Sequence, residues 1–212
     1  MVSRALPRFL SPLEVAEMFK TAGGSPRDLA HQRESCGTSS HVKATRDSML
    51  LKCLYYLGLR NSEVRSLEIG DIDAINRTVK VVQGKGKKDR YVPIPGEFAD
   101  EMKEYIGGRS GRLFEGRGSE GELSDRHLRR IVKHYAQLAN VRKYEEIHPH
   151  TLRHSYATHL QNSGVPLNVI QNMLGHSRLE TTTIYTHMGI DRAREFIDNA
   201  FKIRYGEKSS ND

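Results

Sequence analysis

Residues 69–95, IGDIDAINRTVKVVQGKGKKDRYVPIP, carry the pattern that decides the fold class. Runs of β-branched and aromatic residues are separated by Asn76-Arg77 and by the basic, glycine-containing segment 84–89. Such runs between turn residues are typical of strands joined by hairpins, and Pro93 and Pro95 end the last of them. The stretch predicts a small antiparallel sheet of about three strands with a basic hairpin tip.

The sequence on both sides of this stretch predicts helices. Ser11 to Glu14 form a capping box with proline at the first helical position, and Gly58, Gly164 and Gly175 are stop signals. Residues 23–40 and 107–124 are rich in turn residues and are expected to be loops, and 206–212 a disordered tail. The predicted helices cover residues 12–22, 41–57, 62–67, 96–106, 125–139, 149–162, 166–174, 179–185 and 191–204. The expected fold class is α+β and mainly α-helical.

Length and cysteine content limit the class of protein. The 212 residues correspond to roughly one domain, long enough to bury a hydrophobic core without disulfides. Cys36 and Cys53 are too far apart for a CxxC pair, so neither a disulfide scaffold nor a cysteine zinc site organises the fold. No apolar run reaches the roughly 18 residues of a membrane span, and no signal-peptide core is present, so we expect a cytoplasmic protein with no membrane partner.

The basic residues are concentrated in two segments. The chain has 33 Lys and Arg against 26 Asp and Glu, a formal net charge of +7. Residues 126–154 hold seven basic and two acidic residues, and residues 84–90 hold four and one. Such patches bind a polyanion such as DNA by neutralising phosphates and releasing counterions. A solvated basic face explains the charge equally well, so charge alone leaves both interpretations open.

Two short motifs contain residues suited to anion chemistry. In GLRNSE, residues 58–63, Arg60 follows a helix stop on a tight turn, and taken alone a surface arginine paired with Glu63 is the better explanation. In HPHTLRH, residues 148–154, His150 and Arg153 share a helix face, whereas His154 is assigned to another face. An imidazole beside a guanidinium disfavours a metal ion and favours an anion, although incidental histidines are an equally good explanation.

A third segment and the missing motifs complete the survey. His176 stands at a helix stop and Tyr185 nine residues later, where a packed tyrosine is the commoner explanation. His150 is followed by Thr151, so the HExxH zinc pattern is absent, and no nucleotide-binding or GxSxG motif occurs. We therefore expect no metal and no cofactor.

Taken in order, the motifs GLRNSE, QGKGKKDR, HTLRH, LGH and IYTH resemble those of the tyrosine recombinase, or phage integrase, family. The resemblance extends over about residues 8–190. It implies that family's catalytic-domain fold. It also implies site-specific recombination, in integration, excision or dimer resolution, through a 3′-phosphotyrosyl intermediate and without metal or ATP.

The resemblance also implies roles. By this resemblance Tyr185 is the nucleophile, and Arg60 and Arg153 clamp the non-bridging oxygens of the phosphate. Lys85 protonates the leaving 5′-oxygen. His150 assists proton transfer, His176 hydrogen-bonds the phosphate, and Glu63 is a structural partner of the turn or of an arginine. The catalytic set is Arg60, Lys85, His150, Arg153, His176 and Tyr185. The expected DNA contacts are Lys87, Lys88, Arg90, Arg126, Arg129, Arg130 and Lys133.

The expected partner is double-stranded DNA, with a monomer in the free state and a homotetramer on DNA. Residues 1–205 are expected to form the catalytic domain, and the family's N-terminal core-binding domain to be absent, because Arg60 leaves no room for it. The apolar stripe of helix 191–204, preceded by a short segment with Gly189, is expected to dock on a neighbouring copy. Packing against its own core is the alternative.

Two other functions are kept as alternatives. A type IB topoisomerase-like nicking-closing enzyme would use similar chemistry without being confined to one sequence. A catalytically silent DNA-binding module would keep the fold alone. The intact set of six motif residues argues against the silent module, because it has no chemical reason to retain them all.

Overall fold

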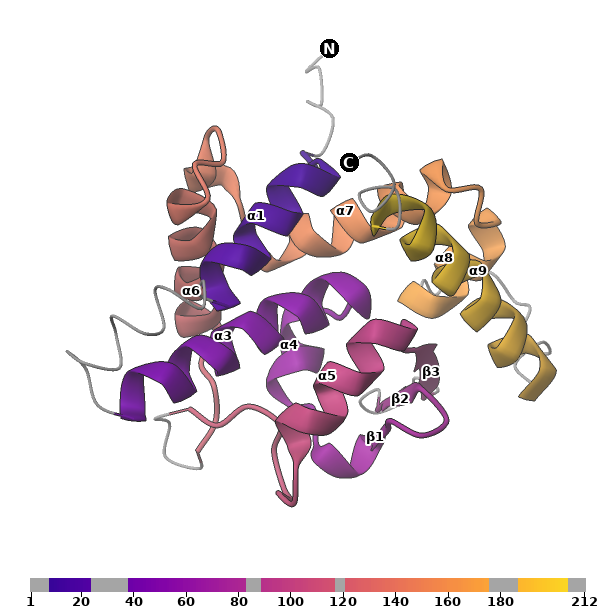
Figure 1. The fold of residues 1–212 in the computed structure, drawn as a ribbon, viewed down its shortest axis with the longest axis horizontal. Helices are drawn as coiled ribbons and strands as arrows, with labels where there is room; N and C mark the ends of the chain where they lie inside the picture. The colour runs from indigo at the N-terminus through magenta and orange to yellow at the C-terminus, as the bar shows by residue number, and fades with distance from the viewer. Residues whose placement is uncertain (1–7, 24–37, 83–88, 117–120, 176–186, 206–212) are drawn as a thin grey trace, which may run out of the picture.

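The computed structural model describes residues 8–23, 38–82, 89–116, 121–175 and 187–205. Within them the fold is mainly helical with one small antiparallel sheet, which confirms the predicted α+β class (Figure 1). The elements in chain order are α1 (Pro12–Gly23), α3 (Thr38–Tyr56), α4 (Asn61–Arg65), η1 (Ile69–Asp71), β1 (Ile72–Asp73), β2 (Thr78–Val81), β3 (Arg90–Pro93), α5 (Gly96–Ile106), α6 (Asp125–Leu138), η2 (Tyr144–Glu146), α7 (Pro149–Asn162), α8 (Leu167–Leu174) and α9 (His187–Tyr205).

Helix boundaries agree with the sequence prediction wherever a local end signal exists. Helices α5 and α7 have the predicted bounds. The Ser124 hydroxyl accepts a hydrogen bond from the His127 N–H and caps α6, and α8 ends at Gly175 in the left-handed conformation, with φ of 65°. Helix α4 covers 61–65 rather than 62–67. The predicted helix 179–185 lies outside the described residues.

The predicted starts of two helices were wrong. Helix α3 begins at Thr38 rather than residue 41, and α9 begins at His187 rather than residue 191. Gly189 therefore lies inside α9 instead of in a connecting segment. Glycine and polar residues weaken helix propensity, but propensity is a weak prior that tertiary packing overrides.

The sheet has the strand order β1-β2-β3, antiparallel throughout. Val79 pairs with Ile72 on one side and Val92 on the other, and Val81 pairs with Arg90. Val79, Val81 and Val92 are buried, as the period-two alternation of a one-sided sheet requires. Strand β3 packs against α8 and α9, so the sheet supports both helices.

Helix α3 forms the centre of the core. It contacts α1, α4, α5 and α7, and Leu50, Leu51 and Leu54 in its C-terminal half are fully buried. Figure 1 shows α3 crossing the middle of the molecule, with α1 and α6 toward one side and α8 and α9 toward the other. The arrangement fixes α7 and the turn after α3 against each other, and these two segments carry the motif arginines.

Helix α9 packs on the chain's own core. Ala193, Ile197, Ala200 and Phe201 are buried, and the Phe201 ring stacks on Tyr156 with centroids 6.4 Å apart. This is the alternative named above, and in this structure the apolar stripe is covered rather than offered to a neighbouring copy.

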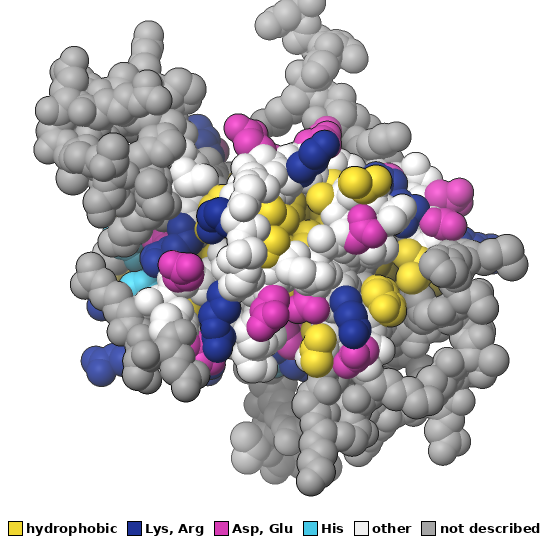
Figure 2. Space-filling view, turned by 90° about the horizontal axis from the view of Figure 1, so that it is seen from below, with side chains coloured by type: hydrophobic (Ala, Val, Ile, Leu, Met, Phe, Trp, Pro, Cys, Tyr) yellow, Lys and Arg dark blue, Asp and Glu magenta, His cyan; other side chains and the backbone are white. Residues whose placement is uncertain are grey.

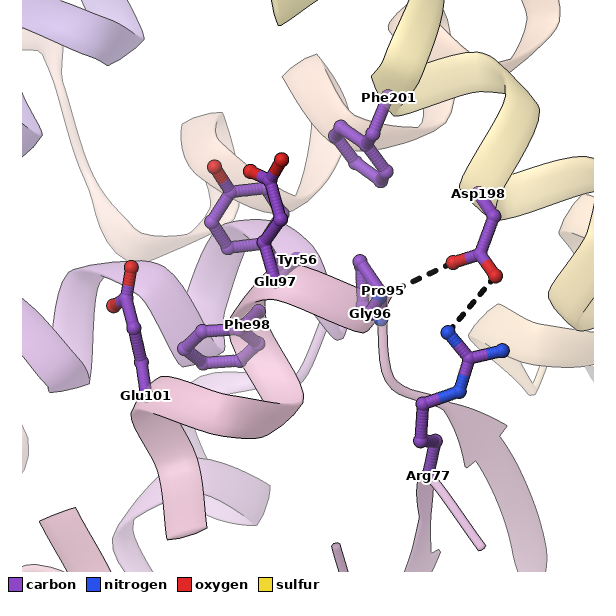
Figure 3. Close-up of a pocket in the computed structure, with 9 residues that line it drawn as sticks. All are labelled: Tyr56, Arg77, Pro95, Gly96, Glu97, Phe98, Glu101, Asp198 and Phe201. Carbon is purple, nitrogen blue, oxygen red and sulfur yellow. Dashed lines mark hydrogen bonds and ion pairs between the residues drawn. The ribbon is translucent and has the colours of Figure 1, made fainter. Parts of the chain in front are cut away.

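Polar contacts hold α9 to the sheet turn and to α5. The Asp198 carboxylate accepts from Arg77 at 2.9 Å and from the Gly96 N–H at 3.1 Å. Figure 3 shows this pair beside a pocket whose wall includes the rings of Tyr56, Phe98 and Phe201. Asp198 therefore links α9 both to the β1–β2 turn and to the first residue of α5.

The molecule's face seen in Figure 2 carries mixed charge. Among the side chains described on this face, acidic and basic ones are interspersed with apolar ones and form no single-sign patch. Among the described residues, no helix is both long and apolar enough to span a membrane.

Candidate active site

A cleft opens between the turn after α3, helix α7 and the end of α8. Three predicted catalytic residues line this cleft: the cationic Arg60 and Arg153, and His150. His150 lies about one turn before Arg153 on α7. The lining residues are Arg8, Arg60, Glu146, His150, Thr151, Arg153, His154, Ala157 and Leu174.

Arg60 is positioned by the turn that ends α3. Gly58 adopts φ of +55°, and Arg60 becomes the N-cap residue of α4. The Arg60 N–H donates to Glu63 Oε2 at 2.7 Å, and its guanidinium donates to Glu63 Oε1 at 2.7 Å and to the Gly175 carbonyl at 2.8 Å. The side chain is 33% exposed and lines the cleft, and it has further N–H donors beyond the two used in these bonds.

Arg153 is buried on α7 and fixed by two carbonyls. Its guanidinium donates to the Gly58 carbonyl and, at 2.5 Å, to the Leu174 carbonyl. Burial, with the nearby charge of Arg60, lowers the pKa of Arg153 to about 10, although Glu63 opposes the shift. The group stays protonated at neutral pH, and two of its five N–H donors are used in these bonds.

Glu63 holds the arginines together. Burial disfavours its charged form, but hydrogen bonds and charge from Arg90, with hydrogen bonds from Arg60, lower its pKa to about 2. Its Oε2 lies 3.8 Å from the Arg153 guanidinium. The structural role expected for Glu63 agrees with this geometry.

His150 stands at the cleft beside both arginines. Partial burial and the charges of Arg153 and Arg60 lower the pKa of its imidazole. The ring is therefore neutral at neutral pH and can accept a proton. His154 also lines the cleft, so its assignment to another face was wrong. Residues four apart on a helix share a face, as the same spacing rule requires.

Sequence reasoning missed two further cleft residues, Arg8 and Glu146. The Arg8 guanidinium lies 3.5 Å from the Glu146 carboxylate and donates to the backbone carbonyls of Arg142 and Lys143. This contact ties the segment before α1 to η2, more than 130 residues away along the chain. No sequence signal marks it, because neither residue belongs to a motif.

Five predicted site residues lie outside the described part of the chain. They are Lys85, Lys87, Lys88, His176 and Tyr185. In sequence, His176 directly follows Gly175, whose carbonyl binds Arg60.

The predicted DNA contacts on α6 are exposed. Arg126, Arg129, Arg130 and Lys133 all lie on its solvent side. Asn61, next to Arg60, donates to Asp125 at the start of α6 at 2.6 Å, so this basic face begins beside the cleft.

Arg90 has a different place from the one expected. Its side chain is 8% exposed and its guanidinium forms a two-pronged pair with Glu63, at 2.7 and 2.8 Å. A guanidinium buried in this way does not fit a phosphate contact at the surface, because its donors already bind a carboxylate.

Gly58→Ala is expected to destabilise the chain by about 2–5 kcal/mol, from about 1–2 for the left-handed conformation and about 1–3 for overpacking. A Cβ at this position would lie 2.7 Å from Tyr156 Cδ1 and 2.8 Å from Leu174 Cδ2. Urea unfolding of the variant measures the loss. Gly108→Ala is the control, because a Cβ there meets nothing within 4 Å. Equal stability of the two variants would contradict the expectation.

Comparison of the sequence with known proteins identifies the family to which the chain is similar. Residues 30–191 match the model of the phage integrase family. The tyrosine recombinase XerA of Thermococcus kodakarensis is 41% identical over 160 residues, covering 73% of this chain and 55% of the relative. The tyrosine recombinase XerC of Corynebacterium efficiens is 37% identical over 201 residues, covering 92% and 58%. The chain therefore spans a little under three fifths of these relatives' length.

Solved structures give the same fold. The integrase from mycobacterium phage Brujita superposes with a TM-score of 0.71 at 23% identity, over 93% of this chain and 59% of that one. A XerA recombinase gives 0.65 at 25% identity, over 98% and 67%. XerH in a post-cleavage complex with its palindromic difH substrate gives 0.63 at 25% identity, over 94% and 54%. On the family match, the shared fold and the identity to XerA and XerC, this chain belongs to the phage integrase family of tyrosine recombinases.

Proposed function

We propose that this chain is the catalytic part of a site-specific DNA recombinase that breaks and rejoins strands through a 3′-phosphotyrosyl intermediate. The observation that carries the proposal is the convergence of Arg60 and Arg153, from segments 93 residues apart in the sequence (153 − 60), on one cleft beside the neutral His150. Family membership and the DNA complex of the similar XerH support it.

The charge of the cleft suits a phosphodiester. Three guanidiniums, those of Arg60, Arg90 and Arg153, surround the one carboxylate of Glu63, which leaves an excess of two positive charges. Negative charge grows on the non-bridging oxygens of the pentacovalent transition state. Guanidinium donors that are already in position stabilise this charge without reorganising, as a bound metal ion would do in other enzymes.

The proposed reaction balances without a cofactor. The Tyr185 oxygen attacks the phosphorus, its proton passes to the neutral imidazole of His150, and the bond to the 5′-oxygen breaks. Lys85 protonates that oxygen, and His176 hydrogen-bonds the phosphate. The phosphoester energy is kept in the phosphotyrosyl bond, so rejoining by a 5′-hydroxyl needs neither metal nor ATP.

A trapped adduct tests the proposal. The substrate is a pool of randomised duplexes, 5′-labelled and nicked in one strand, so that cleavage a few nucleotides before the nick releases a short fragment with a free 5′-hydroxyl. With EDTA present and ATP absent, a labelled covalent protein–DNA adduct is expected on a denaturing gel. DNA binding without any adduct would support the silent module instead.

Sequencing the trapped DNA separates the remaining alternatives. A recombinase is expected to yield adducts at one sequence or a narrow set. Cleavage spread over unrelated sequences would favour the topoisomerase-like enzyme. The homotetramer on DNA and the monomeric free state remain part of the proposal, and light scattering with and without a two-arm site measures both.

DNA affinity is expected to fall steeply with salt, because basic side chains on α6 displace counterions from phosphates. Lys133→Ala should weaken binding on all sequences and make the log–log slope of affinity against salt less negative by about 1. Fluorescence anisotropy at several salt concentrations measures the slope. Lys103→Ala on α5 is the control, since that exposed lysine lies on another helix. Equal slopes for the two variants would remove α6 from the DNA interface.

A further inference from the structure

The C-terminal end of α8 is bound by arginines from three separate segments. Its last carbonyls have no partner within the helix, as at every helix end. They accept instead from a strand, from another helix and from a turn. The bonds are Met173 with Arg90 at 2.8 Å, Leu174 with Arg153 at 2.5 Å, and Gly175 with Arg60 at 2.8 Å. The position of the end of α8 and the positions of the arginine side chains therefore depend on each other.

The three arginines differ in access. Arg60 and Arg153 line the cleft, whereas Arg90 lies behind them and is absent from its lining. All three of its guanidinium nitrogens are used: Nε binds Met173, and the two terminal nitrogens bind the two oxygens of Glu63. When a phosphate competes for the cleft arginines, Arg90 keeps its bonds, so it can hold Glu63 and α8 in place.

Arg90 also settles the charge balance at Glu63. A buried carboxylate is strongly destabilising unless it is paired with a cation. With Arg90 as its two-pronged partner, the charges of Arg60 and Arg153 remain largely uncompensated and available to an anion. Without Arg90, the same carboxylate would be compensated only by Arg60 and Arg153, and their attraction for a phosphate would fall.

We propose that Arg90 is a positioning residue of the cleavage site. Through Glu63 and the Met173 carbonyl it fixes the two cleft arginines and the end of α8 for the DNA phosphate. The inference rests on the proposed function, because the adduct is its main readout.

Arg90→Met tests the inference. Single-turnover adduct formation at saturating DNA is expected to slow by about 10- to 100-fold, the usual effect of losing a residue that orients a catalytic one. DNA affinity should fall by no more than a few-fold, because the two cleft arginines bind only the scissile phosphate of the duplex and Arg90 itself does not reach the surface. Arg90→Lys should recover little of the rate, because an ammonium lacks the planar fork. Arg90→Lys carries the same test if Arg90→Met does not fold.

Arg77→Met is the matched control. It breaks an ion pair of similar length, 2.9 Å to Asp198, that lies away from the cleft (Figure 3). Each variant is assayed well below its own melting temperature. Wild-type adduct rates in folded Arg90→Met and Arg90→Lys, or an equal loss in Arg77→Met, would overturn the inference.

A double variant separates positioning from general stability. Adding Glu63→Gln to Arg90→Met removes the carboxylate that competes for the cleft arginines, so adduct formation should recover several-fold over Arg90→Met. No recovery would contradict the charge argument. If the wild-type chain forms no adduct, the proposed function fails and this inference falls with it. If the wild type is active and the Arg90 variants equal it, the inference alone fails.

Discussion

Tyr185→Phe is expected to form no covalent adduct while binding DNA within about twofold of the wild-type affinity. The substitution removes only the hydroxyl, which is the proposed nucleophile, and changes no charge. Loss of a nucleophile typically costs at least about 10⁴-fold in rate, below the detection limit of a gel. Labelled nicked duplex on a denaturing gel measures the adduct, and anisotropy measures the affinity.

Tyr91→Phe is the control for this experiment. Tyr91 is 45% exposed on β3, so it is an accessible tyrosine that has no proposed role in the reaction. Its variant should form adduct at the wild-type rate. Adduct formation by Tyr185→Phe at that rate would remove Tyr185 as the nucleophile, whatever the outcome for Tyr91.

Arg153→Lys is expected to slow adduct formation by about 10²- to 10³-fold, or about 3–4 kcal/mol, as loss of one transition-state donor does. The Arg153 fork reaches the Gly58 and Leu174 carbonyls and keeps donors for a phosphate. A single ammonium cannot occupy all these positions at once. Quenched single-turnover reactions at saturating DNA measure the rate.

Arg129→Lys controls for the loss of a guanidinium as such. Arg129 is exposed on α6 and pairs with Asp125, so the lysine variant should cleave within about threefold of wild type. Arg153→Lys at a similar rate would contradict the proposed clamp.

Local signals made much of the fold predictable. The proline and glycine limits of 149–162, the proline before 96–106 and the serine cap before 125 each act within one helical turn. The helix starts at 38 and 187 were mispredicted because the polar residues 38–40 and Gly189 are poor helix formers and were assigned to loops. Packing of Ile197 and Phe201 on the core stabilises α9 independently of such signals.

The site was predictable only in part. Motif order pointed to Arg60, His150 and Arg153, and the structure brings these three together. The place of Arg90 could not be predicted, because it follows the basic segment 84–89 in the sequence and its partner Glu63 is 27 residues away. Charge patterning assigns such an arginine to the surface, whereas the long-range pair buries it.

The three arginine bonds at the end of α8 also have a consequence for biosynthesis. The bonds that complete the cleft join residues far apart in the chain, by 83 positions for Arg90 and Met173 and 115 for Arg60 and Gly175. Contacts of such separation form late in folding, because the intervening loops must close first. A nascent chain that has emerged only as far as α7 lacks the Leu174 and Gly175 carbonyls that bind Arg153 and Arg60. The proposed cleavage activity therefore requires the end of α8 to dock against Arg60, Arg90 and Arg153.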